Sequence, residues 1–252
     1  MSRPLAVVCL SGGMDSTVCA TLAARDYDCF GLHFSYGQRT QARELRASRE
    51  VAQAVGLRDL MVLETDLFRR IGGSALTDLR IAVPKAGVEG AGSGESRAGS
   101  SERTAAEIPV TYVPFRNAHF LSAAVSWAEV LGAGTVFIGA VEQDSSGYPD
   151  CRPAYYEAFN ELIRRGAKES GIRVVTPLIQ LRKHEIVRLG VELGAPLHVS
   201  WSCYAGETEA CGVCESCDLR LRAFAAAGVN DPIPYATGAV TNRIAEGERI
   251  AR

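Results

Sequence analysis

The chain has 252 residues, of which 47% are hydrophobic, so it can bury the core of one sizeable α/β domain without disulfide bonds. Its net charge of -2 gives no overall positive field for holding a nucleic-acid backbone, and we expect no nucleic-acid partner. The apolar stretch 5–10 is too short to span a membrane, and no signal-peptide cleavage pattern surrounds it. We therefore expect a cytoplasmic protein with no membrane partner.

Five short apolar runs alternate with helical patterns along the chain. They are residues 5–10, 29–34, 60–63, 135–140 and 173–176. Each run has the length of a buried strand. The apolar spacing of a helix is found in residues 117–131 and again in residues 153–170. Strands alternating with helices predict an α/β fold with a doubly wound parallel sheet, which binds ligands at the carboxyl ends of its strands.

The composition also suggests how the chain is divided. Residues 1–200 are expected to form the nucleotide-binding and catalytic α/β domain, and residues 201–252 a metal-binding segment and a C-terminal helix that pack on the same domain. Residues 85–107 are rich in Gly, Ser, Ala and charge, with almost nothing apolar to bury. This composition predicts a flexible surface insertion. A mobile lid over the site is the alternative.

The first expected strand leads directly into the sequence Ser-Gly-Gly-Met-Asp-Ser-Thr at residues 11–17. Glycines let the backbone approach a phosphate, and a new helix N-terminus directs amide donors at it. Asp15 suits such a site if Mg²⁺ lies between its carboxylate and the phosphates, so we expect Mg·ATP. The same residues would also fit an ordinary strand-to-helix turn. The expected nucleotide-binding residues are Leu10, Ser11, Gly12, Gly13, Met14, Asp15, Ser16 and Thr17.

Four of the eight cysteines are clustered, at Cys203, Cys211, Cys214 and Cys217. A tight loop could place their thiolates tetrahedrally around one ion. The spacing predicts a structural Zn²⁺ site, which is fully coordinated and therefore not catalytic. An iron-sulfur cluster and a pair of disulfides are the alternatives.

Three polar segments fall at other expected strand-to-helix junctions, at residues 34–39, 112–122 and 144–153. Such junctions belong to a site more often than to a core. The candidate substrate-binding residues in them are Tyr36, Gln38, Arg116, Asn117, Asp144, Tyr148, Asp150 and Arg152. In the alternative interpretation, Asn117 is only a helix N-cap and residues 144–152 are an ordinary loop.

The expected catalytic residues are Asp15, Ser16, Arg152 and Lys183. Lys183 follows the last expected strand and could stabilise charge at the α-phosphate, although a solvated surface lysine is an equal alternative. Cys151 has no second cysteine nearby to resolve a persulfide. We therefore expect Cys151 to pack in the substrate pocket rather than to act as a nucleophile.

The Ser-Gly-Gly-x-Asp-Ser sequence resembles the loop of the N-type ATP pyrophosphatases, the PP-loop or adenine nucleotide α-hydrolase-like family. With the three polar segments, residues 176–178, Lys183 and residues 201–204, the chain resembles the 7-cyano-7-deazaguanine synthases over nearly its whole length except residues 85–107. The resemblance implies a ligase of queuosine biosynthesis that converts 7-carboxy-7-deazaguanine and ammonia to 7-cyano-7-deazaguanine. It also implies attack on the α-phosphate of ATP, adenylated acid and amide intermediates, and a homodimer.

Two other interpretations are set against this one. Another PP-loop adenylating enzyme, such as a tRNA-thiolating enzyme or tRNA-lysidine synthetase, would be expected to carry a basic RNA-binding domain or a catalytic cysteine pair, and neither is evident. A nucleotide-binding regulatory protein that lost the chemistry is less consistent with the joint presence of Asp15, Ser16, Arg152 and Lys183.

Overall fold

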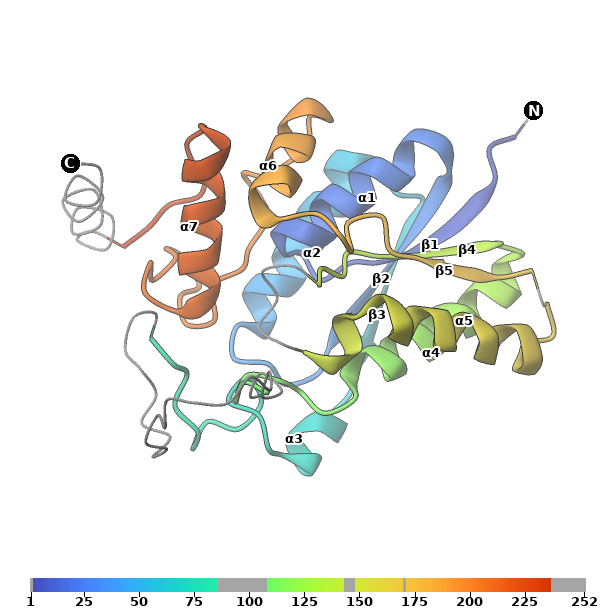
Figure 1. Ribbon diagram of the computed structural model, residues 1–252, viewed down its shortest axis with the longest axis horizontal. Helices are drawn as coiled ribbons and strands as arrows, with labels where there is room; N and C mark the ends of the chain where they lie inside the picture. Colours follow the sequence, from blue (N-terminus) through green and yellow to red (C-terminus); the bar gives the residue numbers. More distant parts are fainter. Residues whose placement is uncertain (1, 86–107, 143–147, 170, 237–252) are drawn as a thin grey trace, which may run out of the picture.

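The computed structural model describes residues 2–85, 108–142, 148–169 and 171–236. Its centre is a parallel sheet of five strands in the order β3-β2-β1-β4-β5 (Figure 1). The strands are β1 (Leu5–Cys9), β2 (Asp28–Ser35), β3 (Asp59–Glu64), β4 (Thr135–Ile138) and β5 (Arg173–Val175). The expected parallel sheet is confirmed, and each strand boundary lies within two residues of its expected place. The strand order reverses at β1, which pairs with β2 on one side and β4 on the other.

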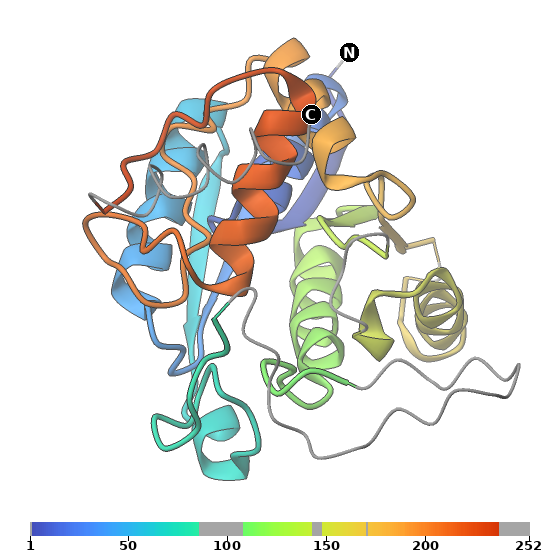
Figure 2. The ribbon, with the colours of Figure 1, turned by 60° about the vertical axis from the view of Figure 1, so that its left-hand side comes forward.

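Helices cover both faces of the sheet. They are α1 (Met14–Asp26), α2 (Gln41–Val55), α3 (Leu67–Ile71), α4 (Arg116–Leu131), α5 (Pro153–Gly166), α6 (Lys183–Glu192) and α7 (Glu215–Ala227). Figures 1 and 2 show α1, α2, α6 and α7 on one side of the sheet and α4 and α5 on the other. The fold is therefore doubly wound, as expected.

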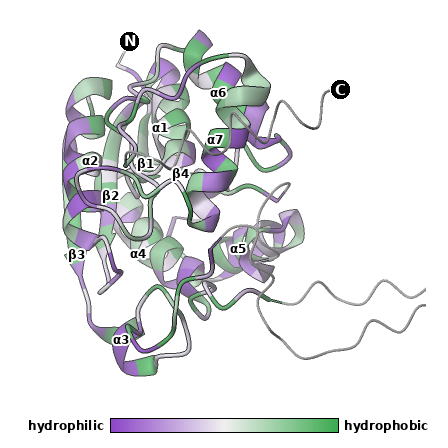
Figure 3. Cartoon of the chain, turned by 90° about the vertical axis from the view of Figure 1, so that its left-hand side faces the viewer, coloured by the Kyte–Doolittle hydropathy of each residue, from purple (hydrophilic) through white to green (hydrophobic). Residues whose placement is uncertain are grey.

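The alternation of side chains along β1 explains the two cores. Ala6 and Val8 belong to the apolar cluster under α1 and α6, whereas Val7 and Cys9 belong to the cluster under α4 and α5. A strand buried on both faces needs an uninterrupted apolar sequence, which is what made β1 recognisable. The helices instead mix hydrophilic and hydrophobic residues, as Figure 3 shows for α2 and α7, because one side of each meets solvent.

Two expected helix boundaries were wrong. The α4 helix begins at Arg116, one residue early, and its N-cap is Phe115 in a left-handed conformation (φ 55°), so Asn117 is not the N-cap. The α5 helix ends at Gly166 rather than at Ser170, because Ala167 after it adopts an extended backbone. Glycine favours such a helix end since its backbone loses more entropy in a helix than that of other residues.

The α7 helix, which lies beyond residue 200, packs on the helices that cover one face of the sheet. Ala223 and Phe224 of α7 join the apolar cluster that contains Val18 of α1 and Ile186 of α6. The expected insertion lies outside the described residues except for Lys85, which forms an isolated bridge with Cys214. Among the residues that the structure describes, no helix has both the length and the apolar character that crossing a bilayer requires.

Candidate active site and metal centre

A cavity of about 320 Å³ lies at the carboxyl ends of β1, β2 and β4. Leu10, Leu32 and Ile138 line it from these three strands or the residue that follows them. The strand order reverses at this edge of the sheet, which is where doubly wound sheets bind ligands. A ligand is therefore expected to bind in this cavity, in contact with the residues that line it.

The Ser-Gly-Gly-Met-Asp-Ser loop lies at one end of this cavity. The hydroxyl oxygens of Ser11 and Ser16 are 3.0 Å apart, and Ser16 also donates to the carbonyl of Gly13. The N-cap Gly13 supplies no side chain to the amides of the first turn of α1. Gly13, Met14 and their neighbours through Ser16 line the cavity. An uncapped helix N-terminus with two hydroxyls beside it is suited to binding phosphate.

A glycine on each side of the loop permits close packing around it. Gly12 has φ +83°, and a Cβ there would lie 2.7 Å from the carbonyl oxygen of Glu44 in α2. Gly139 follows β4, and a Cβ there would lie 2.8 Å from the carbonyl oxygen of Asp15 and 2.9 Å from the amide nitrogen of Ser16. Only residues without a side chain fit at these two positions, so the loop is clamped between α2 and the end of β4.

Asp15 and Lys183 meet in the cavity, although 168 residues separate them in sequence. Lys183 is the first residue of α6, and its Nζ lies 2.5 Å from Asp15 Oδ2. The side chain of Lys183 is only 17% exposed, which distinguishes it from a solvated surface lysine. Asp15 Oδ1 is buried and has no hydrogen-bond partner among the described residues. A divalent cation beside the phosphates would supply that partner, so the residues present fit Mg²⁺.

The other end of the cavity is aromatic and holds the half-buried guanidinium of Arg116. Arg116 donates from Nη1 to the Tyr36 hydroxyl at 2.9 Å, and its guanidinium lies 5.6 Å from the Tyr36 ring centroid and 5.7 Å from that of Phe120. Tyr148 and Tyr204 line the same region. Burial opposes the charging of Arg116, but the nearby groups, Tyr36 first among them, raise its pKa above the usual value. Such a cation is suited to an anionic ligand.

Other candidate residues stand outside this lining. Asp150 is buried beneath it, where its carboxylate accepts a hydrogen bond from the Asn117 amide and its carbonyl accepts one from the Asn117 side chain. Burial raises the pKa of Asp150, and Arg116 opposes that rise. Arg152 is exposed at the N-cap of α5 and is not brought to the cavity. Asp144 lies outside the described residues.

Tyr36, Gln38, Arg116, Asn117 and Tyr148 all line the cavity, so five of the expected substrate-binding residues are brought together. In the expected nucleotide loop, the lining includes Leu10, Ser11, Gly13, Met14, Asp15 and Ser16. Gly12 and Thr17 support the loop from behind. Thr17 donates from its hydroxyl to the Gly13 carbonyl at 2.9 Å.

Glu44, Phe120 and Gly139 are cavity residues that the sequence analysis did not single out. Gly139 lay within an expected strand, although a glycine directly after the apolar residues 136–138 is a recognisable sign that the strand has ended. Glu44 gave no such sign, since a glutamate in the first turn of a helix ordinarily faces solvent. Here Glu44 accepts hydrogen bonds from Gln38 and Thr40.

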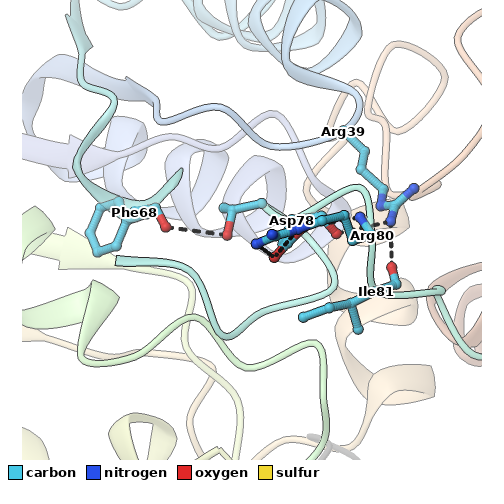
Figure 4. Close-up of polar contacts among 6 residues, drawn as sticks. Arg39, Phe68, Asp78, Arg80 and Ile81 are labelled. Atoms are coloured by element: carbon cyan, nitrogen blue, oxygen red, sulfur yellow. Dashed lines mark hydrogen bonds and ion pairs between the residues drawn. The ribbon is translucent and has the colours of Figure 1, made fainter. Parts of the chain in front are cut away.

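Arg39 also lines the cavity, but its donors are directed at the backbone. Its Nε donates to the carbonyl of Ala75 at 2.7 Å, and its Nη2 donates to that of Ile81 at 2.6 Å and that of Asp78 at 3.3 Å. Figure 4 shows the Arg39 guanidinium beside the Ile81 carbonyl. Arg39 therefore holds the segment around Ala75 near the start of α2, and its Nε and Nη2 donors are used by backbone carbonyls rather than by a ligand.

Cys151 lines the cavity as well, and burial raises the pKa of its thiol to about 11. The thiol is therefore neutral near pH 7 and a poor nucleophile. This agrees with a packing role and gives no support to sulfur transfer.

The four clustered cysteines converge as the spacing predicted. The sulfur atoms of Cys203, Cys211, Cys214 and Cys217 all lie within 4.8 Å of one another, and Cys211 alone among them is partly exposed. The backbone amides of Ala205, Gly206 and Cys211 approach Cys203 Sγ at 3.4, 3.1 and 3.3 Å. Amide donors stabilise thiolates, so the geometry suits a metal ion held by four sulfur ligands.

Trp201 connects this metal centre to the phosphate loop. Its amide donates to the Gly12 carbonyl at 2.7 Å. Its ring packs in the same apolar cluster as Cys203 and Ala47, with the Arg43 guanidinium 4.3 Å from the ring centroid. A rearrangement of the four cysteines is therefore expected to shift Trp201 and, through its hydrogen bond to Gly12, the loop at residues 11–17.

Comparison with known proteins places the chain in a family. The family model described as "Queuosine biosynthesis protein QueC" matches residues 5–228. The 7-cyano-7-deazaguanine synthase of Acidobacterium capsulatum is 70% identical over 234 residues, which are 93% of this chain and 97% of that protein. The synthase of Koribacter versatilis is 62% identical, over 92% of this chain and 93% of that protein.

The similarity extends to relatives of lower sequence identity. The 7-cyano-7-deazaguanine synthase of Chlorobium chlorochromatii is 53% identical over 92% of this chain and 96% of that protein. The matched residues include the phosphate loop, Arg116, Lys183 and the four clustered cysteines. The chain therefore belongs to the QueC family of queuosine biosynthesis proteins.

Proposed function

We propose that the protein catalyses the ATP-dependent conversion of 7-carboxy-7-deazaguanine and ammonia to 7-cyano-7-deazaguanine, a step in the synthesis of the queuosine precursor. The observation that carries this proposal is one cavity that joins the uncapped N-terminus of α1 to an aromatic region around the half-buried Arg116, in a chain of this family. The relatives named 7-cyano-7-deazaguanine synthase support the same substrate.

ATP is proposed to bind with its phosphates at the uncapped N-terminus of α1. Ser11 and Ser16 would add hydroxyl donors, and Asp15 would hold Mg²⁺ through the carboxylate oxygen that lacks a partner. When bound, the cation would neutralise phosphate charge. Lys183 lies beside Asp15 and is proposed to stabilise the charge that develops at the α-phosphate.

The substrate carboxylate is proposed to attack the α-phosphorus of ATP, which releases pyrophosphate and forms an acyl-adenylate. Ammonia then displaces AMP and gives the amide. A second ATP activates the amide oxygen, and loss of AMP together with the nitrogen's protons forms the nitrile. The protein positions these reactants and balances their charge, so the scheme needs no covalent protein nucleophile.

Arg116 is proposed to bind the substrate carboxylate, since its half-buried guanidinium lies beside the aromatic rings of the lining. Tyr36 orients it through a hydrogen bond, and Asp150 fixes Asn117 and with it the start of α4. Arg152 is exposed and does not line the cavity, so Arg116 is preferred for this role. Ser16 is also proposed as a catalytic residue, because its hydroxyl would donate a hydrogen bond to a phosphate of ATP.

The four cysteines are proposed to hold one structural Zn²⁺, because soft thiolates at this short spacing favour zinc. A thiolate site suits a reducing compartment, so we propose that the enzyme acts in the cytoplasm. We also propose a catalytic domain of residues 1–200 and a zinc-binding segment of residues 201–252 packed on it. The family resemblance further leads us to propose a homodimer, which size-exclusion chromatography with light scattering would test.

A tRNA-thiolating activity is the alternative, and it would require a reactive cysteine. The Cys151 thiol, whose pKa burial raises to about 11, is neutral near pH 7 and does not favour it.

The proposed function is tested by incubating the purified protein with ATP, Mg²⁺, ammonium and 7-carboxy-7-deazaguanine, and following the products by mass spectrometry. Nitrile accompanied by AMP and pyrophosphate is expected, and a folded Asp15→Ala variant should form none of them. Pyrophosphate release only with another acceptor would reject the substrate. Full activity of the Asp15→Ala variant would reject the role of that carboxylate.

A further inference from the structure

Glu44 places a second carboxylate in the cavity lining, and the proposed reaction does not use it. It lies in the first turn of α2, on the far side of the phosphate loop from β4. Of the two carboxylates in the described lining, Asp15 is paired with Lys183. The carboxylate of Glu44 instead accepts hydrogen bonds from two neutral side chains, Gln38 and Thr40.

The neighbours of Glu44 hold its carboxylate in one orientation. Gln38 Nε2 donates to Glu44 Oε2 at 3.0 Å and to the Phe34 carbonyl at 3.4 Å, while Gln38 Oε1 accepts from the Tyr36 amide at 2.9 Å. These contacts use both amide hydrogens of Gln38 and fix which way its side chain faces. Thr40 Oγ1 lies 2.8 Å from Glu44 Oε1 on the other side.

Each carboxylate oxygen therefore has one protein donor and keeps acceptor capacity, since an ionised carboxylate accepts about four hydrogen bonds. Burial raises the pKa of Glu44, and the bonds from Gln38 and Thr40 together with the charge of Arg116 oppose that rise. Glu44 is half-buried and forms no ion pair among the described residues, so its remaining acceptor sites are open to donors on a ligand. The ligand that suits it carries two adjacent N–H donors.

A guanine-type base has such an edge, formed by a ring N–H and an exocyclic amino group. The adenine of ATP instead presents a ring nitrogen acceptor beside its amino group, which a carboxylate repels. The aromatic side chains of Tyr36 and Phe120 line the same cavity and give it an apolar wall that suits a flat base.

We propose that Glu44 is the specificity-determining residue for the substrate's base, and that it accepts hydrogen bonds from the ring N–H and exocyclic amino group of the deazaguanine. Gln38 and Thr40 are positioning residues that orient this carboxylate. Arg116 would bind the carboxylate of the same substrate. This inference rests on the proposed function and adds the residue that recognises the base by hydrogen bonds.

The test compares two substrates with wild-type protein and with Glu44→Gln. One substrate is 7-carboxy-7-deazaguanine, and the other is 7-carboxy-7-deazahypoxanthine, which lacks the exocyclic amino group. The wild type should prefer the first by roughly 10- to 100-fold in kcat/KM for AMP formation, the range expected for a hydrogen bond to a charged group. Glu44→Gln should bring this ratio close to one and leave the KM for ATP unchanged.

The Glu44→Asp variant distinguishes a hydrogen bond to the base from a general requirement for negative charge in the cavity. The shorter side chain keeps the charge but withdraws it from the base, so the ratio should stay low. Glu50→Gln, on the same helix but outside the cavity lining, is the matched control and should keep the wild-type ratio. Circular dichroism and thermal unfolding show whether each variant is folded.

Several results would overturn the inference. Equal use of the two substrates by the wild type would do so without any variant, even if Glu44→Gln failed to fold. An unchanged ratio in folded Glu44→Gln, with a raised KM for ATP or ammonium, would assign Glu44 to those ligands instead. If the wild type neither binds nor adenylates either compound, the proposed function fails first, and the base-reading role fails with it.

Discussion

Replacing Gly139 by alanine should lower activity by displacing the phosphate loop. The added Cβ would lie 2.8 Å from the carbonyl oxygen of Asp15 and 2.9 Å from the amide nitrogen of Ser16. Both atoms belong to the backbone of the first turn of α1, which cannot rotate away as a side chain could. Ordinary contact begins near 3.4 Å, so α1 and the end of β4 must separate by roughly 0.5 Å.

The size of the effect follows from this displacement. A misplacement of about 1 Å can cost about 100-fold in rate, so half of that predicts a loss of roughly tenfold in kcat/KM. Overpacking should also lower the free energy of unfolding by about 1–3 kcal/mol. In a protein of this size that corresponds to a fall in Tm of roughly 2–12 °C. The variant therefore remains folded at assay temperature but has a distorted site.

Gly134→Ala is the matched control at the opposite end of β4, because a Cβ there meets no atom within 4 Å. Steady-state assays of AMP formation at 15 °C, with thermal unfolding of the same samples, compare the two variants. Gly134→Ala should keep wild-type kcat/KM. Wild-type kcat/KM in folded Gly139→Ala, or an equal loss in both variants, would refute the steric reasoning.

Three further predictions concern the phosphate site, the metal centre and the pocket cysteine. Asp15→Asn should lower kcat by roughly 100- to 1,000-fold through lost charge balance, yet change stability by only about 1 kcal/mol, because the Asp15–Lys183 pair is partly exposed. A large loss of stability in unfolding experiments would contradict this. Cys217→Ser, or a strong chelator, should release one Zn²⁺ per chain by elemental analysis, lower Tm and weaken ATP binding; iron in place of zinc would contradict the assignment. Burial raises the pKa of Cys151 to about 11, so only roughly one thiol in 1,000 is ionised at pH 8. Iodoacetamide should therefore alkylate Cys151 slowly at pH 8 and faster as pH rises toward 11, and fast alkylation at pH 7 would be inconsistent with that pKa.

The strands were the most predictable part of the fold. Central parallel strands are buried on both faces, so β1 and β4 appear as uninterrupted apolar runs with polar or glycine residues at their ends. The loop at residues 11–17 could also be recognised from the sequence, since glycines, a carboxylate and hydroxyls are the groups that suit a site for phosphate and Mg²⁺. Likewise, four thiols at short spacing required no long-range information to suggest a metal centre.

Which polar residues line the cavity was less predictable, because that depends on the direction in which each side chain points. Arg152 and Arg116 both start helices next to polar segments, yet the extended backbone of Arg152 leaves it exposed while Arg116 is directed toward Tyr36. The left-handed conformation of Phe115 that precedes Arg116 is rare outside glycine. Glu44 is partly buried because the loop at residues 11–17 and Gln38 pack against its helix, which its local sequence does not reveal.

The central claim is that the substrate's own carboxylate attacks the α-phosphorus of ATP. The most direct measurement uses 7-carboxy-7-deazaguanine with both carboxylate oxygens replaced by ¹⁸O, and mass spectrometry of the AMP formed with ammonium present. Each activation should transfer one ¹⁸O to AMP, so every nitrile should be accompanied by two singly labelled AMP molecules. Unlabelled AMP, or ADP as the nucleotide product, would contradict the account.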